Sequence, residues 1–224
     1  MSRSPFAPDF AQLPKTLPIF PLTGVLLLPG GRLPLNIFEP RYLAMTRAAL
    51  AEARMIGMVQ PTEGQGDAGD PPVYLRGCAG RMTAWSETDD GRYLITLAGV
   101  ARFDIAEELP RNDCLYRRVV PDWTPYRGDL AEDCAPLAAA ERTRLLAAIK
   151  PFFDRHGITA DWKAVEASAD ERLVTTLAMV CPFASGEKQA LLDAKDATER
   201  ARLLTTLMEM ATLGGDMPDD SVRH

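Results

Sequence analysis

The residues best suited to chemistry in this chain lie at one junction, where Glu39 and Arg41 flank Pro40. A carboxylate and a guanidinium at this spacing can form an ion pair, and a carboxylate beside a helix start is favoured by the helix dipole. General acid–base catalysis needs a second positioned group with a tuned pKa, and the neighbouring sequence supplies no such base. The junction therefore predicts a binding or structural role rather than a catalytic one.

The other residues with metal-binding or nucleophilic side chains are scattered along the chain. They are Cys78, Cys114, Cys134, Cys181, His156 and His224, with no C-x-x-C pair among them. Zinc sites use closely spaced cysteines and histidines, so this spacing indicates no metal site. We interpret the cysteines as reduced, buried thiols and His156, next to Gly157, as part of a helix carboxyl end.

One glycine pattern imitates a cofactor motif. Gly64, Gly66 and Gly69 match G-x-G-x-x-G. The dinucleotide fingerprint requires a helix to begin at the glycines, so that its N–H groups meet the pyrophosphate. Here Pro71 and Pro72 follow instead, and the nearby carboxylates repel phosphate. The pattern indicates a surface loop, and we expect no cofactor.

Charge is divided unevenly along the 224 residues. Through Gly128, fourteen Lys and Arg balance fourteen Asp and Glu; from Asp129 onward, eleven basic residues face seventeen acidic ones, which gives the net charge of −6. Phosphate binding draws on clustered positive charge, so this distribution argues against nucleic acid as the main partner. The amino terminus lacks the apolar core of a signal peptide, and no aliphatic run is long enough to span a bilayer. We therefore expect a cytoplasmic protein with no membrane partner.

The stretch that contains the junction has a clear local pattern. Leu33, Leu35 and Ile37 alternate with other side chains, which predicts a strand with one apolar face. Pro40 fixes φ near the helical value and is tolerated at the first helical position. A helix is therefore expected to follow directly, over residues 41–53.

The region from Val73 to Val120 is rich in strand patterns. Asp89-Asp90-Gly91 is a hairpin turn signal between two alternating segments. Many short strands with a single helix near the front predict a small, curled, barrel-like sheet.

Past Asp129 the spacing of apolar residues becomes helical. We expect at least three helices and no strand between Pro136 and Leu213, one of them opened by a capping box at Ser168. The predicted organisation is a β barrel over residues 15–128, a helical subdomain over 129–214, and loose termini over 1–14 and 215–224.

Several short motifs follow one another in a specific order. They are Leu17-Pro18-Ile19-Phe20-Pro21-Leu22, Pro29-Gly30, Leu33-Pro34-Leu35, Ile37-Phe38-Glu39-Pro40-Arg41-Tyr42, Gly80-Arg81, Leu97-Ala98-Gly99-Val100-Ala101-Arg102-Phe103 and Lys188-Gln189-Ala190-Leu191-Leu192. Each is short and apolar, but their order and spacing together resemble the amino-terminal substrate-binding domain of Lon ATP-dependent proteases. The match runs from about Leu17 to Leu213, nearly the whole chain.

The resemblance implies an α+β fold: a PUA-like six-stranded pseudobarrel followed by a carboxyl-terminal helical subdomain. A full Lon protease continues into an ATPase and a peptidase with a serine and a lysine. This sequence has no G-x-x-x-x-G-K motif followed by serine or threonine, and it ends at His224. It is therefore similar to small standalone Lon-domain proteins, and the resemblance carries over no ATP hydrolysis, proteolysis or catalytic residue.

The leading hypothesis is a non-catalytic module that binds protein or peptide segments, as an adaptor or modulator in proteolysis or protein quality control. Its partners are unfolded client segments or a protease, and its candidate binding surface comprises Pro34, Asn36, Phe38, Glu39, Arg41 and Tyr42. If the apolar face of the strand is core, Phe38 points the other way and is either covered by the next helix or left to bind. The sequence leaves open whether Phe38 and Tyr42 belong to the core or to the binding surface.

Two other classes of function remain as alternatives. PUA-like barrels are often RNA binders, and Arg111, Arg117 and Arg118 with Trp123 offer cations beside an aromatic ring. A solvated strand face is the simpler interpretation of these residues. An enzyme is disfavoured, because no reactive constellation accompanies Glu39 and Arg41.

Overall fold

The computed structural model describes residues 8–62, 70–112, 114–131 and 136–213. The chain divides into two compact units. The first comprises Met1–Cys134 with Ala178–Asp193, and the second comprises Ala135–Leu177 with Ala194–His224. The backbone therefore passes from one unit to the other after residues 134, 177 and 193.

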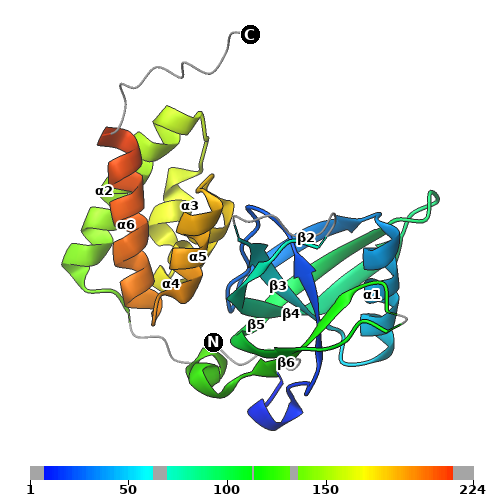
Figure 1. Ribbon diagram of the computed structural model, residues 1–224. Coiled ribbons are helices and arrows are strands. Elements are labelled where there is room, and N and C mark those ends of the chain that lie inside the picture. The colour runs from blue at the N-terminus through cyan, green and yellow to red at the C-terminus, as the bar shows by residue number, and fades with distance from the viewer. Residues whose placement is uncertain (1–7, 63–69, 113, 132–135, 214–224) are drawn as a thin grey trace, which may run out of the picture. The chain divides into compact units, whose positions relative to one another are not determined.

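The first unit is built on a six-stranded mixed sheet that curls on itself (Figure 1). The strand order is β2-β5-β4-β3-β1-β6, with an additional β5–β6 pairing, and only β1 and β3 run parallel. The strands are β1 (Leu17–Pro21), β2 (Arg32–Ile37), β3 (Met55–Pro61), β4 (Val73–Glu87), β5 (Tyr93–Glu108) and β6 (Arg117–Asp122). The predicted α+β fold with a six-stranded pseudobarrel is confirmed.

Phe103 of β5 is a central residue of the barrel core. Its side chain is fully buried, and its ring centroid lies 5.6 Å from that of Trp123. Gly57 and Gly77 make room for this ring, because a Cβ at either position would come within 2.7 or 2.8 Å of its Cζ atom, respectively. The buried neighbours that complete the cluster are Leu13, Leu17, Ile19, Met55, Val59, Ala79, Ala101 and Val119.

The segment between β1 and β2 forms no strand, yet residues 26–28 are buried. It lies directly against the sheet at Gly99, where a Cβ would come within 1.9 Å of the carbonyl oxygen of Leu28. Gly30, with φ of +75°, donates its N–H to the Gly99 carbonyl at 3.0 Å, and the Gly99 N–H donates to the Gly31 carbonyl at 2.8 Å. This is the hydrogen-bond pattern of a glycine β-bulge, and it sets the register of β2 on β5.

Two side chains fasten helix α5 (Ser185–Asp193) to the barrel. The buried guanidinium of Arg102 pairs with Asp129 at 2.8 Å and donates to the Leu192 carbonyl at 3.3 Å. Buried Lys188 of α5 donates from Nζ to the Gly24 carbonyl at 2.6 Å. These contacts explain why α5 belongs to the first unit although α6 (Ala197–Leu213) belongs to the second.

The predicted domains over 15–128 and 129–214 remain a prediction, and the compact units are drawn differently from them. Polar contacts of α5 with the barrel cause the difference at the carboxyl side. At the amino side, a loose arm was expected over 1–14, but over its described part Leu13 joins the barrel core and the Pro14 carbonyl accepts the Trp123 indole N–H at 3.0 Å. Residues 1–7 and 215–224 lie outside the described residues.

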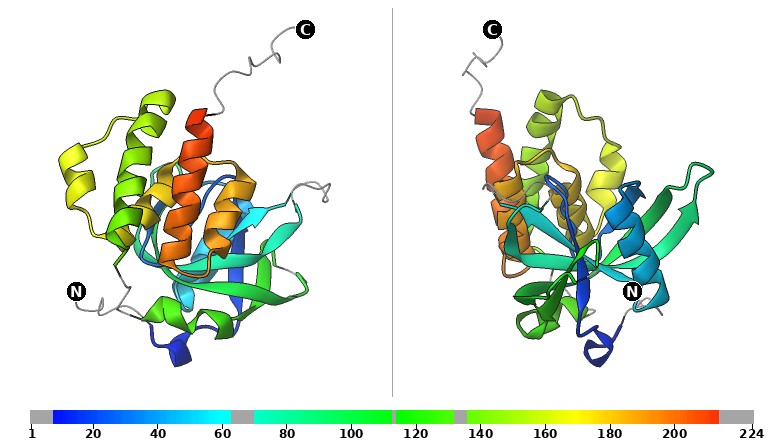
Figure 2. Two further views of the ribbon diagram at one scale, coloured as in Figure 1. Left: turned by 90° about the vertical axis from the view of Figure 1, so that its left-hand side faces the viewer. Right: turned by 45° about the vertical axis from the view of Figure 1, so that its right-hand side comes forward.

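The second unit is helical. It contains α2 (Ala139–His156), α3 (Trp162–Ala167), most of α4 (Asp170–Val180) and α6. In the two views of Figure 2, α2 and α6 lie side by side, and the pairs Arg144–Glu209 and Glu141–Arg202 link them. Gly157, with φ of +63°, ends α2 as expected. Within the described part of Pro136–Leu213 there are at least three helices and no strand, which confirms that prediction.

The capping box expected at Ser168 was wrong. The Ser168 hydroxyl donates to the Ala164 carbonyl at 2.6 Å and so belongs to the end of α3, while α4 begins at Asp170. The Asp170 carboxylate accepts the Leu137 N–H at 2.9 Å and pairs with Arg142. The Ser168 hydroxyl that the local pattern had assigned to the start of α4 is therefore used at the end of α3.

We expect Gly99→Ala to destabilise the protein by about 2–3 kcal/mol, because the new Cβ collides with backbone that cannot easily move. A matched control is Gly186→Ala in α5, where a Cβ meets nothing within 4 Å. That change should alter stability by less than about 1 kcal/mol, in the stabilising direction. Urea unfolding monitored by fluorescence measures both. Equal effects of the two substitutions would contradict the close approach at Gly99.

Candidate functional site

Three neighbouring strands present one exposed face. Asn36 of β2 lies opposite Leu94 of β5, which lies opposite Ser86 of β4. One pair further along, the same relation joins Pro34, Thr96 and Ala84. Directly opposed residues of antiparallel strands point to the same side of a sheet, so these six side chains share a face, called here the open face.

The open face is hollowed and carries no charge at its centre. The hollow has a volume of about 490 Å³. Its lining consists of Pro34, Leu35, Asn36, Ala84, Trp85, Ser86, Leu94, Ile95 and Thr96, all of them uncharged. Such a surface accepts apolar or neutral polar groups and penalises a buried unpaired charge.

Large apolar side chains stand exposed on this side of the sheet. Leu94 is 46% exposed and Phe38, two residues beyond Asn36, is 59% exposed. The guanidinium of Arg92 lies 5.8 Å from the centroid of the Phe38 ring and pairs with Asp90 at 2.7 Å. Phe38 and Leu94 are therefore large apolar side chains that the fold leaves at the surface, and they are candidates for contact with a partner.

The opposite side of the same strands is only partly covered, because Trp85, which lies opposite Ile95 on that side, is 53% exposed. Ile37, Tyr93 and Ile95 are at most 6% exposed. Helix α1 (Pro40–Ala51) reaches this side through Arg47, whose Nε donates to the Tyr93 hydroxyl at 3.1 Å. That hydrogen bond raises the pKa of Arg47. Of the alternating apolar residues of β2, Ile37 is thus buried and Leu33 and Leu35 are half-buried, whereas the open face is left to solvent.

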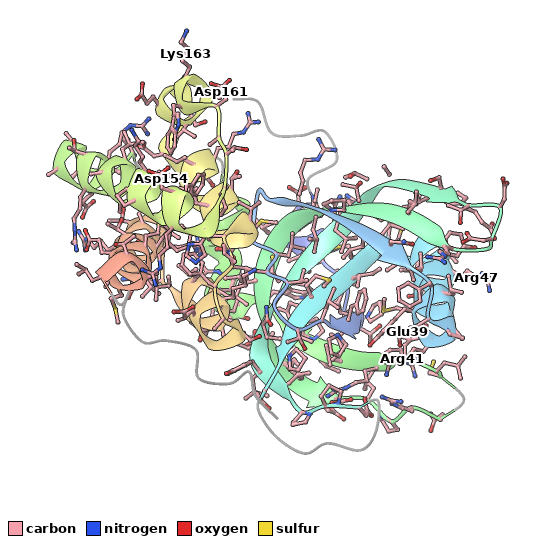
Figure 3. The ribbon with its side chains drawn as sticks, turned by 90° about the horizontal axis from the view of Figure 1, so that it is seen from above. Glu39, Arg41, Arg47, Asp154, Asp161 and Lys163 are labelled. Carbon is pink, nitrogen blue, oxygen red and sulfur yellow. The ribbon has the colours of Figure 1, made fainter. Side chains whose placement is uncertain are left out.

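Glu39 and Arg41 form the expected ion pair at the start of α1. Arg41 Nε donates to Glu39 Oε2 at 3.0 Å, and Figure 3 shows the two side chains together there. Glu39 occupies the N-cap position, but its side chain makes no capping hydrogen bond. The pair is half-exposed, so it borders the candidate surface without supplying a reactive group.

Tyr42 is a core residue. It is 7% exposed, and its ring centroid lies 4.1 Å from that of Phe20. Burial raises the pKa of Tyr42. The six predicted surface residues therefore divide: Pro34, Asn36 and Phe38 are exposed, Glu39 and Arg41 lie at the rim, and Tyr42 is inside.

Comparison with known proteins adds a family to this geometry. The family model of the ATP-dependent protease La (LON) substrate-binding domain matches residues 16–210. The chain belongs to this family.

Similar proteins agree with that membership. "Lon protease 2" of Sorangium cellulosum is 24% identical over 213 residues, which cover 92% of this chain and 26% of the relative. "Lon protease 2" of Myxococcus xanthus is 30% identical over 109 residues, or 48% of this chain and 13% of the relative. The chain thus spans about a quarter of the length of these curated relatives, or less.

Solved structures share the fold. A Lon N-terminal domain protein from Xanthomonas campestris has a TM-score of 0.62 at 20% identity, covering 85% of this chain and 97% of its own. The N-terminal domain of Mycobacterium avium complex Lon protease has a TM-score of 0.62 at 18% identity, covering 87% and 98%.

In this LON substrate-binding domain, sequence reasoning missed four of the six residues of the open face: Ala84, Ser86, Leu94 and Thr96. The hairpin signal at Asp89-Asp90-Gly91 was recognised, and counting outward from it places residues 86 and 94 opposite each other. What the pattern could not supply was the pairing of this hairpin with β2, because that contact is distant in sequence.

Three of the four residues of the RNA alternative, Arg111, Arg117 and Trp123, are engaged within the protein. Arg117 is buried and pairs with Glu108 at 2.6 Å, which raises the pKa of Arg117 and lowers that of Glu108. Arg111 pairs with Asp70. Trp123 packs on Phe103 in the barrel core, so its ring is not available for base stacking.

Other site types find no support within the described ranges. These residues hold no group of three or more His, Cys, Asp or Glu side chains suited to a metal ion. None of their helices combines the length and the apolar content that crossing a bilayer would require. The glycine pattern of residues 64–69 lies outside the described part of the chain.

We expect Phe38→Ala to change the free energy of unfolding by less than about 1 kcal/mol, because the ring is exposed. Tyr42→Ala should cost about 3–5 kcal/mol, since it leaves a cavity beside Phe20. Chemical denaturation of the two variants in parallel tests the assignment. A large loss for Phe38→Ala would place that ring in the core and remove it from the candidate site.

Proposed function

We propose that this chain is a non-catalytic recognition module that binds apolar segments of unfolded proteins at the open face. The observation that carries the proposal is the uncharged hollow, lined in part by exposed Leu94 and with exposed Phe38 directly after the end of β2, in a chain of the LON substrate-binding domain family. Unfolded chains expose apolar side chains that folded proteins bury, so a neutral apolar surface favours them.

The open face also supplies a basis for selection. Nine lining residues without a charge cannot compensate a buried carboxylate or ammonium group. Segments with a charge in the hollow are therefore disfavoured, whereas charges at the segment ends stay in solvent. Neutral polar groups of Asn36, Ser86 and Thr96 can accept or donate hydrogen bonds and so tolerate serine, threonine or backbone in the bound segment.

The binding free energy from the apolar side chains of Phe38 and Leu94 alone is too small for micromolar affinity. Fully burying a leucine or phenylalanine contributes about 1.5–3 kcal/mol, and here part of each is already buried. Two such anchors give on the order of 3 kcal/mol, whereas micromolar binding needs about 8 kcal/mol. Recognition at useful affinity therefore requires further contacts with the segment.

In the cell, we propose that the module delivers client segments to a protease or modulates their turnover, in the cytoplasm. The family membership and the Lon protease relatives support this context. The chain spans only about a quarter of the length of those relatives, so the adaptor role is our proposal and is not carried over from them.

We expect Phe38→Ala and Leu94→Ala each to weaken binding of reduced, carboxymethylated α-lactalbumin by about five- to tenfold, through loss of buried apolar area. Leu75→Ala is the matched control, because Leu75 is 67% exposed on β4 but neither lines the hollow nor adjoins β2 in the sequence, as Phe38 does. Titration calorimetry on folded samples gives the dissociation constants. Equal weakening by all three variants, or by none, would refute the open face as the site.

A second expectation concerns catalysis. Purified protein should hydrolyse neither ATP nor casein, because the sequence offers no phosphate-binding G-x-x-x-x-G-K loop and its ionisable residues form no nucleophile–base pair in the described site. A coupled phosphate-release assay and a casein gel assay measure the two activities. Turnover that persists through further purification, above a mock preparation, would overturn the non-catalytic assignment.

A further inference from the structure

Strand β2 stands at one end of the sheet. In the strand order it has β5 on one side and no further strand among the described residues on the other. Edge strands present unpaired backbone N–H and C=O groups, which can pair with another extended chain. The side chains exposed on β2 are those of Arg32, Pro34 and Asn36, and the latter two belong to the open face.

The hydrogen-bond phase of β2 can be read from the bulge at its start. The Gly99 N–H donates to Gly31, so the next hydrogen-bonded pairs follow at steps of two: Leu33 with Leu97, and Leu35 with Ile95. The residues between them pair without hydrogen bonds to β5. Pro34 fits this phase, since it has no N–H to give to the ladder.

It follows that Arg32, Pro34 and Asn36 direct their backbone groups away from β5. Arg32 and Asn36 offer an N–H and a C=O each, whereas Pro34 offers only a C=O. An added strand could therefore form all the hydrogen bonds of these three positions except one. This row runs directly beside the open face.

We propose that the bound segment is an extended stretch of unfolded polypeptide that adds to β2 as a further strand. The proposal rests on the proposed function and specifies its ligand: uncharged, rich in β-branched residues, and free of proline. Backbone pairing at β2 supplies the additional contacts that two apolar anchors lack, and alternate side chains of the added strand face the same side as Phe38 and Asn36.

Pro34 has a defined part in this arrangement. Proline in an edge strand removes one donor and so limits uncontrolled pairing with other chains. Binding at β2 is therefore weaker than at an edge strand without proline. Weaker binding suits a module that must release its clients. Restoring the missing N–H should strengthen it.

The first test is an N-methyl scan of a synthetic probe, a fluorescein-labelled ten-residue peptide that alternates valine with threonine and ends in lysines. In an added strand only every second N–H points to β2. Affinity measured by fluorescence anisotropy should fall at least threefold on N-methylation of alternate residues and remain unchanged at the intervening ones. Losses without this period of two would overturn strand addition.

The second test alters the edge. Pro34→Thr restores an outward N–H and should raise probe affinity by roughly two- to tenfold. Asn36→Pro removes an outward N–H and should lower it by a similar factor, while Asn36→Ala keeps the N–H and controls for the lost side chain. Both positions are exposed, so circular dichroism should report native folds.

The outcomes separate this inference from the proposed function. If Phe38→Ala weakens binding of unfolded α-lactalbumin but the scan shows no alternation and Pro34→Thr no gain, recognition at the open face stands and strand addition fails. If neither protein nor peptide binds, both fail. Analytical ultracentrifugation of Pro34→Thr provides a further outcome. Self-association that depends on concentration, without a gain in probe affinity, would also overturn the inference, because Pro34 would then only prevent pairing between copies of this chain.

Discussion

The close approach of the Leu28 carbonyl to Gly99 is the contact on which the site depends. It allows the non-strand segment of residues 26–28 to lie on the sheet, and the bulge at Gly30 and Gly31 then fixes β2 against β5. A slip of one residue in that register would exchange the two faces of β2. Phe38 and Asn36 would turn toward protein, and Leu35 and Ile37 toward solvent. A backbone contact at a glycine, which has no side chain, therefore decides which residues of β2 are exposed on the open face.

The motifs that mark the LON substrate-binding domain have separate physical reasons in this chain. Gly99 provides space for a crossing backbone, and Phe103 fills the barrel where Gly57 and Gly77 leave room for its ring. Arg102 lies between Gly99 and Phe103 in the sequence. Its side chain points to the other side of the strand from Phe103, where the buried guanidinium pairs with Asp129 and donates to the end of α5. Removing one partner of a buried ion pair leaves an uncompensated buried charge, which is strongly destabilising. Through Phe103 and Arg102, one short stretch of β5 therefore stabilises both the barrel core and the attachment of α5, which is distant in sequence.

The open face combines an exposed apolar surface with several features that limit aggregation. Its central leucine is flanked by Asn36 and Ser86, which keep the apolar area discontinuous. Pro34 interrupts the free edge, and Arg92 with Asp90 places charge beside Phe38. Weak, reversible contact with unfolded chains requires such a balance, because a larger apolar face would favour self-association. If the proposed function holds, the small number of anchors and the proline in the edge strand favour transient binding over stable assembly.

The sequence by itself determined the fold class, the helix-rich carboxyl part and the strand-to-helix junction at Pro40, because these follow from local periodicity and from the geometry of proline. It also singled out Pro34, Asn36 and Phe38 through simple alternation. It could not place Phe38 outside and Tyr42 inside, since both are aromatic residues near one junction and only the packing of Tyr42 on Phe20 separates them. Leu94, the partner of Asn36, and Leu192, the partner of Arg102, lie far along the chain from those residues. Contacts between distant segments depend on the closed sheet, so only the tertiary structure decided which side chains share the open face.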